Sequence, residues 1–149
     1  MKKNLLRWYF ALGLSGLTAC QEAPTTQQHC YAHYSDEDTI SLSLRITSSA
    51  VTGYIRYNAG PDRNQGRIQG QMHGDTLLAS YRLEINGQLS QTAAPVAFLR
   101  QSNGFVEGFG DIKESEGLFT FKTREAIWFD PNRVLTPVVC SEVAAPSQQ

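Results

Sequence analysis

The sequence predicts an all-β domain, built as an antiparallel meander of about eight to ten strands. Apolar and polar residues alternate strictly in DTISLSLRI, where every second residue from Ile40 to Ile46 is apolar, as in a half-buried strand. Hairpin-type pairs, namely Gly74-Asp75, Asn86-Gly87 and Asn103-Gly104, separate the apolar stretches. Beyond the first thirty residues, no window of ten or more residues has the apolar period of a helix.

Each expected strand is bounded by turn residues, so that strands adjacent in the sequence pair with one another. Pro137 places the last strand at an edge or at a bulge, because proline cannot donate to a β-ladder. The expected strands are DTISLSLRI (38–46), SSAVTGYIRYN (48–58), QGRIQGQMHG (65–74), TLLASYRLEI (76–85), PVAFLRQ (95–101), GFVEGFGDI (104–112), EGLFTFKT (116–123), AIWFD (126–130) and VLTPVVC (134–140).

A meander of this length has two edges, and closing it into a barrel removes both of them. Cys30 and Cys140 bracket the predicted strands, so a bond between them would tie the first strand to the last. The expected fold is therefore a small closed or partly open β-barrel. A β-sandwich is the alternative, because glycines inside strands permit sharp coiling in either fold. These glycines are Gly53, Gly70, Gly108 and Gly110.

The first twenty residues, MKKNLLRWYFALGLSGLTAC, have the pattern of an export signal. A basic start precedes the apolar stretch 8–17, which is too short to span a bilayer. The stretch 17–20, Leu-Thr-Ala-Cys, resembles the lipobox of bacterial lipoprotein signal peptides. This resemblance implies that residues 1–19 are removed and that Cys20 receives lipid as the first residue of the mature chain. An ordinary signal peptide with a chance cysteine is the alternative.

A lipid on Cys20 would anchor the chain in a membrane, since acyl chains bury apolar methylenes. The absence of aspartate after Cys20 favours the outer membrane of a Gram-negative bacterium, and residues 20–28 read as a flexible tether. Loss of three basic residues with the signal leaves ten basic and fourteen acidic residues, a net charge of −4. This charge argues against nucleic acid as a partner. The lost residues are Lys2, Lys3 and Arg7.

Two cysteines, Cys30 and Cys140, remain after lipidation of Cys20. An even pair in an oxidising compartment predicts a disulfide, with a single domain over 29–140 and a disordered tail over 141–149. Two free thiols are one alternative. The other is a metal site formed by Cys30 with His29 and His33, because these histidines share one face of a strand. The expectation is a disulfide, with no metal and no cofactor.

The domain as a whole resembles a family of small uncharacterised bacterial lipoproteins. Its pattern has a cysteine at each end, a strand beginning Asp-Thr, a Val-Thr-Gly strand, a Gly-Asp-Thr-Leu segment and a Glu-Gly-x-Gly segment. The resemblance implies lipidation, export and a shared fold, but no activity. The matching residues are Cys30, Tyr31, Asp38-Thr39, Val51-Thr52-Gly53, Tyr57, Gly66, Gly70, Gly74-Asp75-Thr76-Leu77, Ala79, Tyr81, Phe98-Leu99, Glu107-Gly108, Gly110 and Cys140.

Four residues are candidates for a binding site: Glu107, Asp111, Phe105 and Phe109. Glu107 and Asp111 are four residues apart in one expected strand, so their carboxylates would share a face. The alternative is a buried Glu107 paired with an arginine such as Arg82 or Arg100. Phe105 and Phe109 share a face that would be either core or an exposed groove. No motif of a catalytic nucleophile, zinc protease or phosphate loop is present, so the sequence does not predict an enzyme.

Two functions follow from a lipid-tethered barrel. The first is a non-enzymatic binding or protein-interaction module, which would present its outer surface to an envelope protein. The second is a carrier that holds a small apolar ligand inside a lipocalin-like barrel. A filled interior favours the module, and a cavity of a few hundred Å³ favours the carrier.

Overall fold

The computed structural model describes residues 25–143 of the 149-residue chain. The predicted signal peptide, Cys20 and the segment 144–149 lie outside the described residues. Eleven strands and one short 3₁₀ helix, η1, make up the described fold. The elements are β1 (Thr26–Tyr34), β2 (Asp38–Thr47), β3 (Ala50–Ala59), β4 (Asp62–His73), β5 (Thr76–Ile85), β6 (Gln88–Leu89), β7 (Ala94–Gln101), β8 (Gly104–Phe109), β9 (Ile112–Ser115), β10 (Leu118–Phe121), β11 (Trp128–Pro137) and η1 (Cys140–Glu142).

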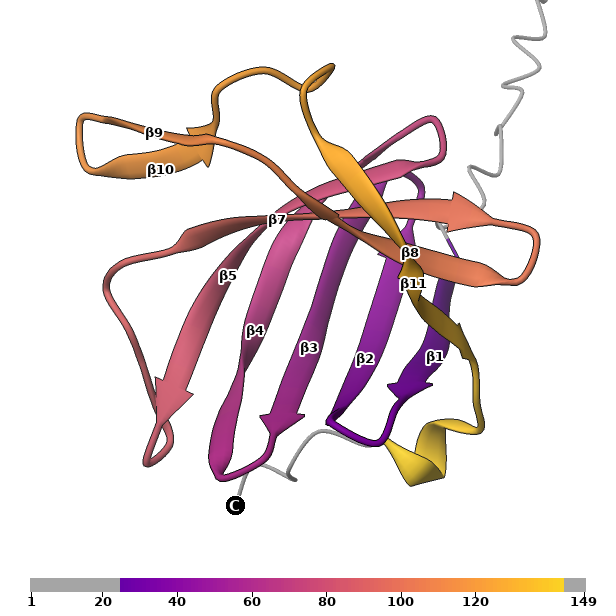
Figure 1. The fold of residues 1–149 in the computed structure, drawn as a ribbon. Coiled ribbons are helices and arrows are strands. Elements are labelled where there is room, and N and C mark those ends of the chain that lie inside the picture. The colour runs from indigo at the N-terminus through magenta and orange to yellow at the C-terminus, as the bar shows by residue number, and fades with distance from the viewer. Residues whose placement is uncertain (1–24, 144–149) are drawn as a thin grey trace, which may run out of the picture.

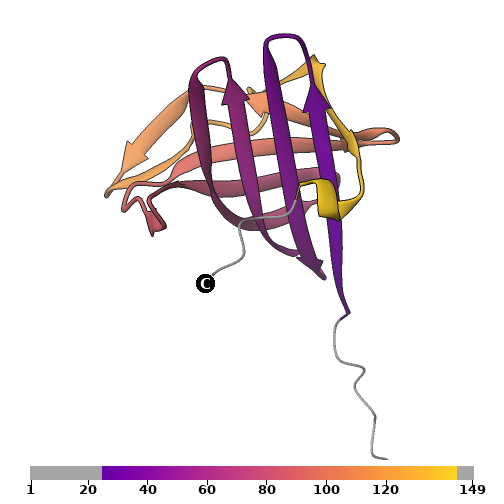
Figure 2. The ribbon, with the colours of Figure 1, turned by 90° about the horizontal axis from the view of Figure 1, so that it is seen from below.

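Eight of these strands close into an antiparallel barrel. The order is β4-β3-β2-β1-β11-β8-β7-β5, and β4 pairs with β5 to complete the circle. Figure 1 shows the barrel, with the separate two-stranded sheet β9–β10 projecting from it. Viewed from below, the purple strands β1–β4 lie side by side and the later strands cross behind them at a steep angle (Figure 2). The predicted all-β barrel is confirmed, and the alternative sandwich is not formed.

The tight turns follow the predicted turn chemistry. Asn86 and Gly87 join β5 to β6 with positive φ angles of 51° and 78°, which suits a hairpin turn that needs a left-handed backbone at both positions. Gly74, with φ of 62°, lies in the turn between β4 and β5. These residues lower the cost of the reversals that let neighbouring strands pair.

The ends of the folded region extend further than predicted. Strand β1 begins at Thr26, inside the segment expected to be a tether, and pairs with β2 along its whole length. At the other end, η1 leads into Val143, which is 6% exposed and packs with Cys30 and Ala32. Residues 141–143 are therefore part of the fold, because burial of Val143 fixes them against β1.

The barrel interior is filled by its own side chains. Seven of the eight barrel strands contribute to the main core cluster a residue that is at most 2% exposed, and β1 adds the half-buried Tyr31 to this cluster. A Cβ atom at Gly53 would collide with Leu44, and one at Gly70 would collide with Ala79. These glycines thus mark close packing and leave no void beside them. The core residues are Ile40, Leu42, Leu44, Val51, Ile55, Ile68, Leu77, Phe98, Phe105 and Leu135.

The predicted disulfide between Cys30 and Cys140 is confirmed. It joins β1 to the segment after β11, with a Cα–Cα distance of 5.1 Å. The ladder between β1 and β11 is short, with only Tyr31 opposite Pro137 and Ala32 opposite Thr136. The bridge therefore reinforces the barrel next to its shortest ladder, the β1–β11 seam.

Candidate functional site

A chain of polar side chains runs from the barrel interior to the β1–β11 seam. The Tyr57 hydroxyl on β3 donates to Glu107 Oε1 on β8 at 2.6 Å. Arg133 on β11 donates through Nε to Glu107 Oε2 at 2.9 Å. The guanidinium of Arg133 also places Nη2 3.1 Å from Asp38 Oδ2 on β2. Arg133 thus bridges two carboxylates that come from opposite sides of the seam.

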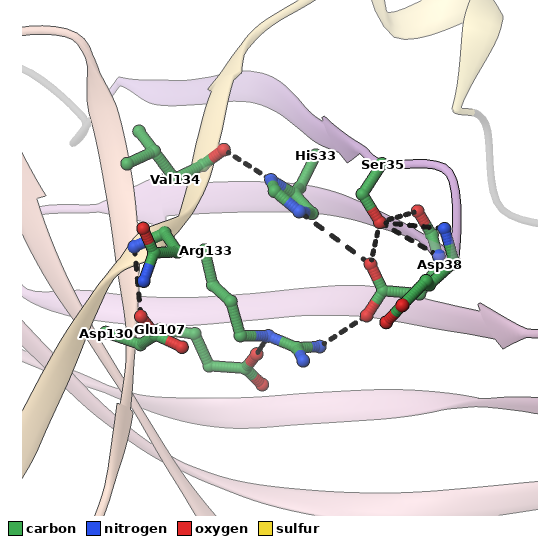
Figure 3. Close-up of polar contacts among 9 residues, drawn as sticks. His33, Ser35, Asp38, Glu107, Asp130, Arg133 and Val134 are labelled. Atoms are coloured by element: carbon green, nitrogen blue, oxygen red, sulfur yellow. Dashed lines mark hydrogen bonds and ion pairs between the residues drawn. The ribbon is translucent and has the colours of Figure 1, made fainter.

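The chain continues from Asp38 to β1. His33 Nε2 lies 3.7 Å from Asp38 Oδ1, and His33 Nδ1 lies 3.1 Å from the carbonyl oxygen of Val134 on β11. The Ser35 hydroxyl donates to Asp38 Oδ1 at 2.8 Å. Figure 3 shows Asp38 joined both to His33 and to Arg133. These contacts connect β1 and β11 where their backbone ladder has already ended.

Glu107 is the most buried charged group of this network, at 6% exposed. A buried carboxylate is tolerated when it is paired and hydrogen-bonded, and each oxygen of Glu107 has a donor. Burial, together with the charge of Glu107 and the hydrogen bond to it, raises the pKa of Tyr57 well above its ordinary value of 10.0. Tyr57 therefore stays protonated and acts as a donor in the folded chain.

The raised pKa of Tyr57 predicts a loss of stability in alkali. The unfolded chain releases the tyrosine proton near pH 10, and the folded chain releases it only at higher pH. The contribution of Tyr57 to folding stability is therefore complete below about pH 10, and it is lost as the pH rises through the folded pKa. We expect Tyr57→Phe to be less stable by about 1–3 kcal/mol at neutral pH, since Glu107 loses a donor. The variant should lose less stability between about pH 9 and 11. Urea unfolding at both pH values measures this difference.

Burial also raises the pKa values of three other tyrosines, Tyr31, Tyr54 and Tyr81. Their alkaline loss of stability is expected to be the same in the wild type and in Tyr57→Phe. Equal alkaline losses in the wild type and in Tyr57→Phe would contradict the assignment to Tyr57.

The structure separates the four predicted site residues. Glu107 is buried in the network, but Asp111 lies beyond the end of β8, is 79% exposed at its side chain, and pairs with Lys122 at 3.1 Å. The predicted carboxylate pair is wrong, because β8 ends at Phe109 and its alternation does not reach residue 111. Phe105 is fully buried and packs edge to face on Tyr31, so it belongs to the core.

Phe109 lies at the rim of the barrel and is 41% exposed. Its ring centroid is 6.0 Å from that of Trp128, and the Arg133 guanidinium carbon lies 5.9 Å from the centre of the Phe109 ring. Ile112 on β9, Leu118 on β10 and Trp128 are also exposed large apolar residues. We call Phe109 and Trp128, whose rings lie against each other, the rim patch.

The histidines around Cys30 have other partners. His33 belongs to the polar network, His29 has a contact with Gln27 at 3.3 Å, and Cys30 is oxidised. Within residues 25–143, no group of three or more histidine, cysteine or acidic side chains is arranged to hold a metal.

A pocket of about 380 Å³ lies outside the barrel wall. Strand β10 bounds it on one side with Phe119 and Phe121, and Leu78 and Pro95 bound it on the other from β5 and β7. Arg124, in the loop after β10, provides the charged group among its lining residues. The volume lies within the range typical of small-molecule sites.

Arg133, Asp38 and Tyr57 were missed as site residues. Arg82 and Arg100, the predicted partners of Glu107, lie elsewhere, since both are exposed and Arg100 lies over the ring of Phe105 at 5.7 Å. The sequence does contain one sign of this site: Glu107 lies between Val106 and Gly108 in an expected strand. Such a position favours a buried acid with a cationic partner. The partner itself depends on which distant strands meet.

Comparisons with known proteins return no match, whether to models of protein families, to curated proteins or to solved structures. In the part of the chain that the structure covers, no helix is long and apolar enough to cross a membrane.

Proposed function

We propose that the chain is a lipid-anchored, non-enzymatic binding module of the bacterial cell envelope, which binds its partner with the outside of its barrel. The lipobox-like stretch ending at Cys20 supports the anchor. The partner would be another envelope protein, reached by a barrel that is held near the membrane surface.

The filled interior is the observation that carries this proposal. A carrier of the lipocalin type needs a cavity within the barrel. Here the fully buried side chains of Phe98 and Phe105 occupy the interior. The Tyr57–Glu107–Arg133 contacts occupy the region next to the seam. Apolar side chains available for binding are found on the outside instead.

The rim patch is the surface that fits a protein partner. Exposed aromatic side chains are enriched at protein interfaces because they bury much area at a low entropy cost. Phe109 and Trp128 lie against each other at the rim, with the half-buried Arg133 beside them. An aromatic pair next to an arginine has the composition that dominates binding energy at interfaces.

A photo-crosslinking amino acid placed at position 128 tests this function in the native host. We expect one discrete crosslinked protein in the envelope fraction, and its loss when Phe109→Ser is added, because the rim patch is then disrupted. A matched probe at Thr52, exposed on the outer face of β3, should give no such product. Cys20→Ala should release the chain from the membrane and reduce the crosslink, since the anchor brings the two proteins together.

Native mass spectrometry of residues 20–149, expressed with Cys20→Ser in the same host, provides the contrary outcome. A retained small molecule, combined with no crosslink from position 128, would overturn the interaction module and favour the carrier.

A further inference from the structure

We propose that the pocket between β10 and the barrel wall binds a small amphipathic anion, namely a molecule with an apolar chain and a carboxylate at one end. The inference rests on the proposed function in one respect, which is that binding takes place on the outside of the barrel. It adds a second site, distinct from the rim patch, and a chemical class of ligand.

The pocket exists because β9 and β10 form a sheet of their own. Strand β10 pairs with β9 alone among the described strands, and it carries Phe119 and Phe121 toward the barrel. Both phenylalanines are half-buried, whereas Leu118 and Thr120 of the same strand are exposed. Two aromatic rings therefore face the barrel wall across a space of about 380 Å³. Figure 1 shows the β9–β10 hairpin standing out from the barrel on the side of β5 and β7.

The opposite wall, on the outer face of the barrel, combines apolar and polar side chains. Leu78 of β5 and Pro95 of β7 contribute apolar atoms, and Gln69 of β4 and Ser80 of β5 line the same face, so an aliphatic chain would contact apolar atoms on both sides of the pocket beside these polar groups. Burial of apolar surface is favourable, which favours an apolar ligand body over a polar one. Proline at position 95 also leaves no N–H to attract a polar group there.

Arg124 determines the charge of the ligand. It is the cationic side chain among the lining residues. Its one polar contact within residues 25–143 joins Nη2 to His73 Nε2, at 3.4 Å. Glu125 follows it in the sequence, yet the described residues show no ion pair between them. By contrast, Arg133 of the polar network pairs with two carboxylates, those of Asp38 and Glu107. The guanidinium of Arg124 is thus available to pair with a carboxylate bound in the pocket.

Octanoate is the probe for this site, and octanol is its uncharged match. Residues 20–149 with Cys20→Ser contain every strand of the barrel, and amide chemical shifts in NMR spectra report where each probe binds. We expect saturable shifts at Leu78–Ser80 and at Phe119–Phe121, with octanoate bound more tightly than octanol. Arg124→Gln should weaken octanoate by about tenfold and leave octanol unchanged, because only the charged contact is lost.

Arg45→Gln is the matched control, because Arg45 is an exposed arginine on β2 that does not line the pocket. Equal loss of octanoate binding in both arginine variants would overturn the site, as would the absence of saturable shifts near β10. If octanoate fails while the crosslink from position 128 forms, the pocket proposal falls and the proposed function stands. If octanoate shifts residues around Phe98 and Phe105 inside the barrel, both fall.

Discussion

Replacing Arg133 with alanine is expected to destabilise the protein by about 3–5 kcal/mol, the range for leaving a buried charge without its partner. Glu107, at 6% exposed, would keep only the Tyr57 hydroxyl as a donor, and Asp38 would lose its cation. The bridge between β2, β8 and β11 would be lost with it. Unfolding in urea, monitored by the fluorescence of Trp128, measures the change.

Three variants show whether the effect belongs to the network. Arg82→Ala removes an exposed arginine of β5 and should change stability by no more than about 0.5 kcal/mol. Arg133→Lys should retain part of the stability, since a single ammonium cannot contact both carboxylates with the geometry of a guanidinium. Glu107→Gln added to Arg133→Ala should recover stability, because the buried group is then neutral. Equal losses for Arg82→Ala and Arg133→Ala would contradict this account.

The fold could be predicted from the sequence because its signals are local. The alternation from Ile40 to Ile46 places one side of β2 in the core, and several of the hairpin reversals have their own turn residues. Asn86 and Gly87 take the positive φ angles that their identities suggest. In a meander, sequence neighbours pair, so local signals are sufficient to set most of the strand order.

The network could not be predicted because its contacts are distant in the sequence and depend on an irregular strand. The strands expected at AIWFD and VLTPVVC are one strand, β11, with a register shift against β8 between Phe129 and Val134. Trp128 lies opposite Phe109 before this shift, and Leu135 lies opposite Phe105 after it. A shift of this kind changes which residues face inward, so the position of Arg133 cannot be read from alternation.

Replacing both Cys30 and Cys140 with serine is expected to cost about 2–5 kcal/mol, the usual range for a native disulfide in a small secreted domain. The bridge closes a loop with a sequence separation of 110, so its loss frees a long unfolded chain. It also stands beside the short β1–β11 ladder, where Val138 N donates to the Cys30 carbonyl at 2.9 Å. Urea unfolding of wild type with and without reductant, and of the double variant, measures the cost.

The disulfide and Arg133 stabilise the same seam by different routes, and the urea slope m separates them. A disulfide acts largely on the unfolded chain, so its removal should raise m as the unfolded chain expands. Arg133→Ala acts on folded contacts and should lower the midpoint with m unchanged. Reductant should reproduce the effect of the double serine variant and have no effect on that variant itself. If reductant leaves the wild type as stable as before, the Cys30–Cys140 bond does not stabilise the barrel, and the seam depends on the polar network and the core alone.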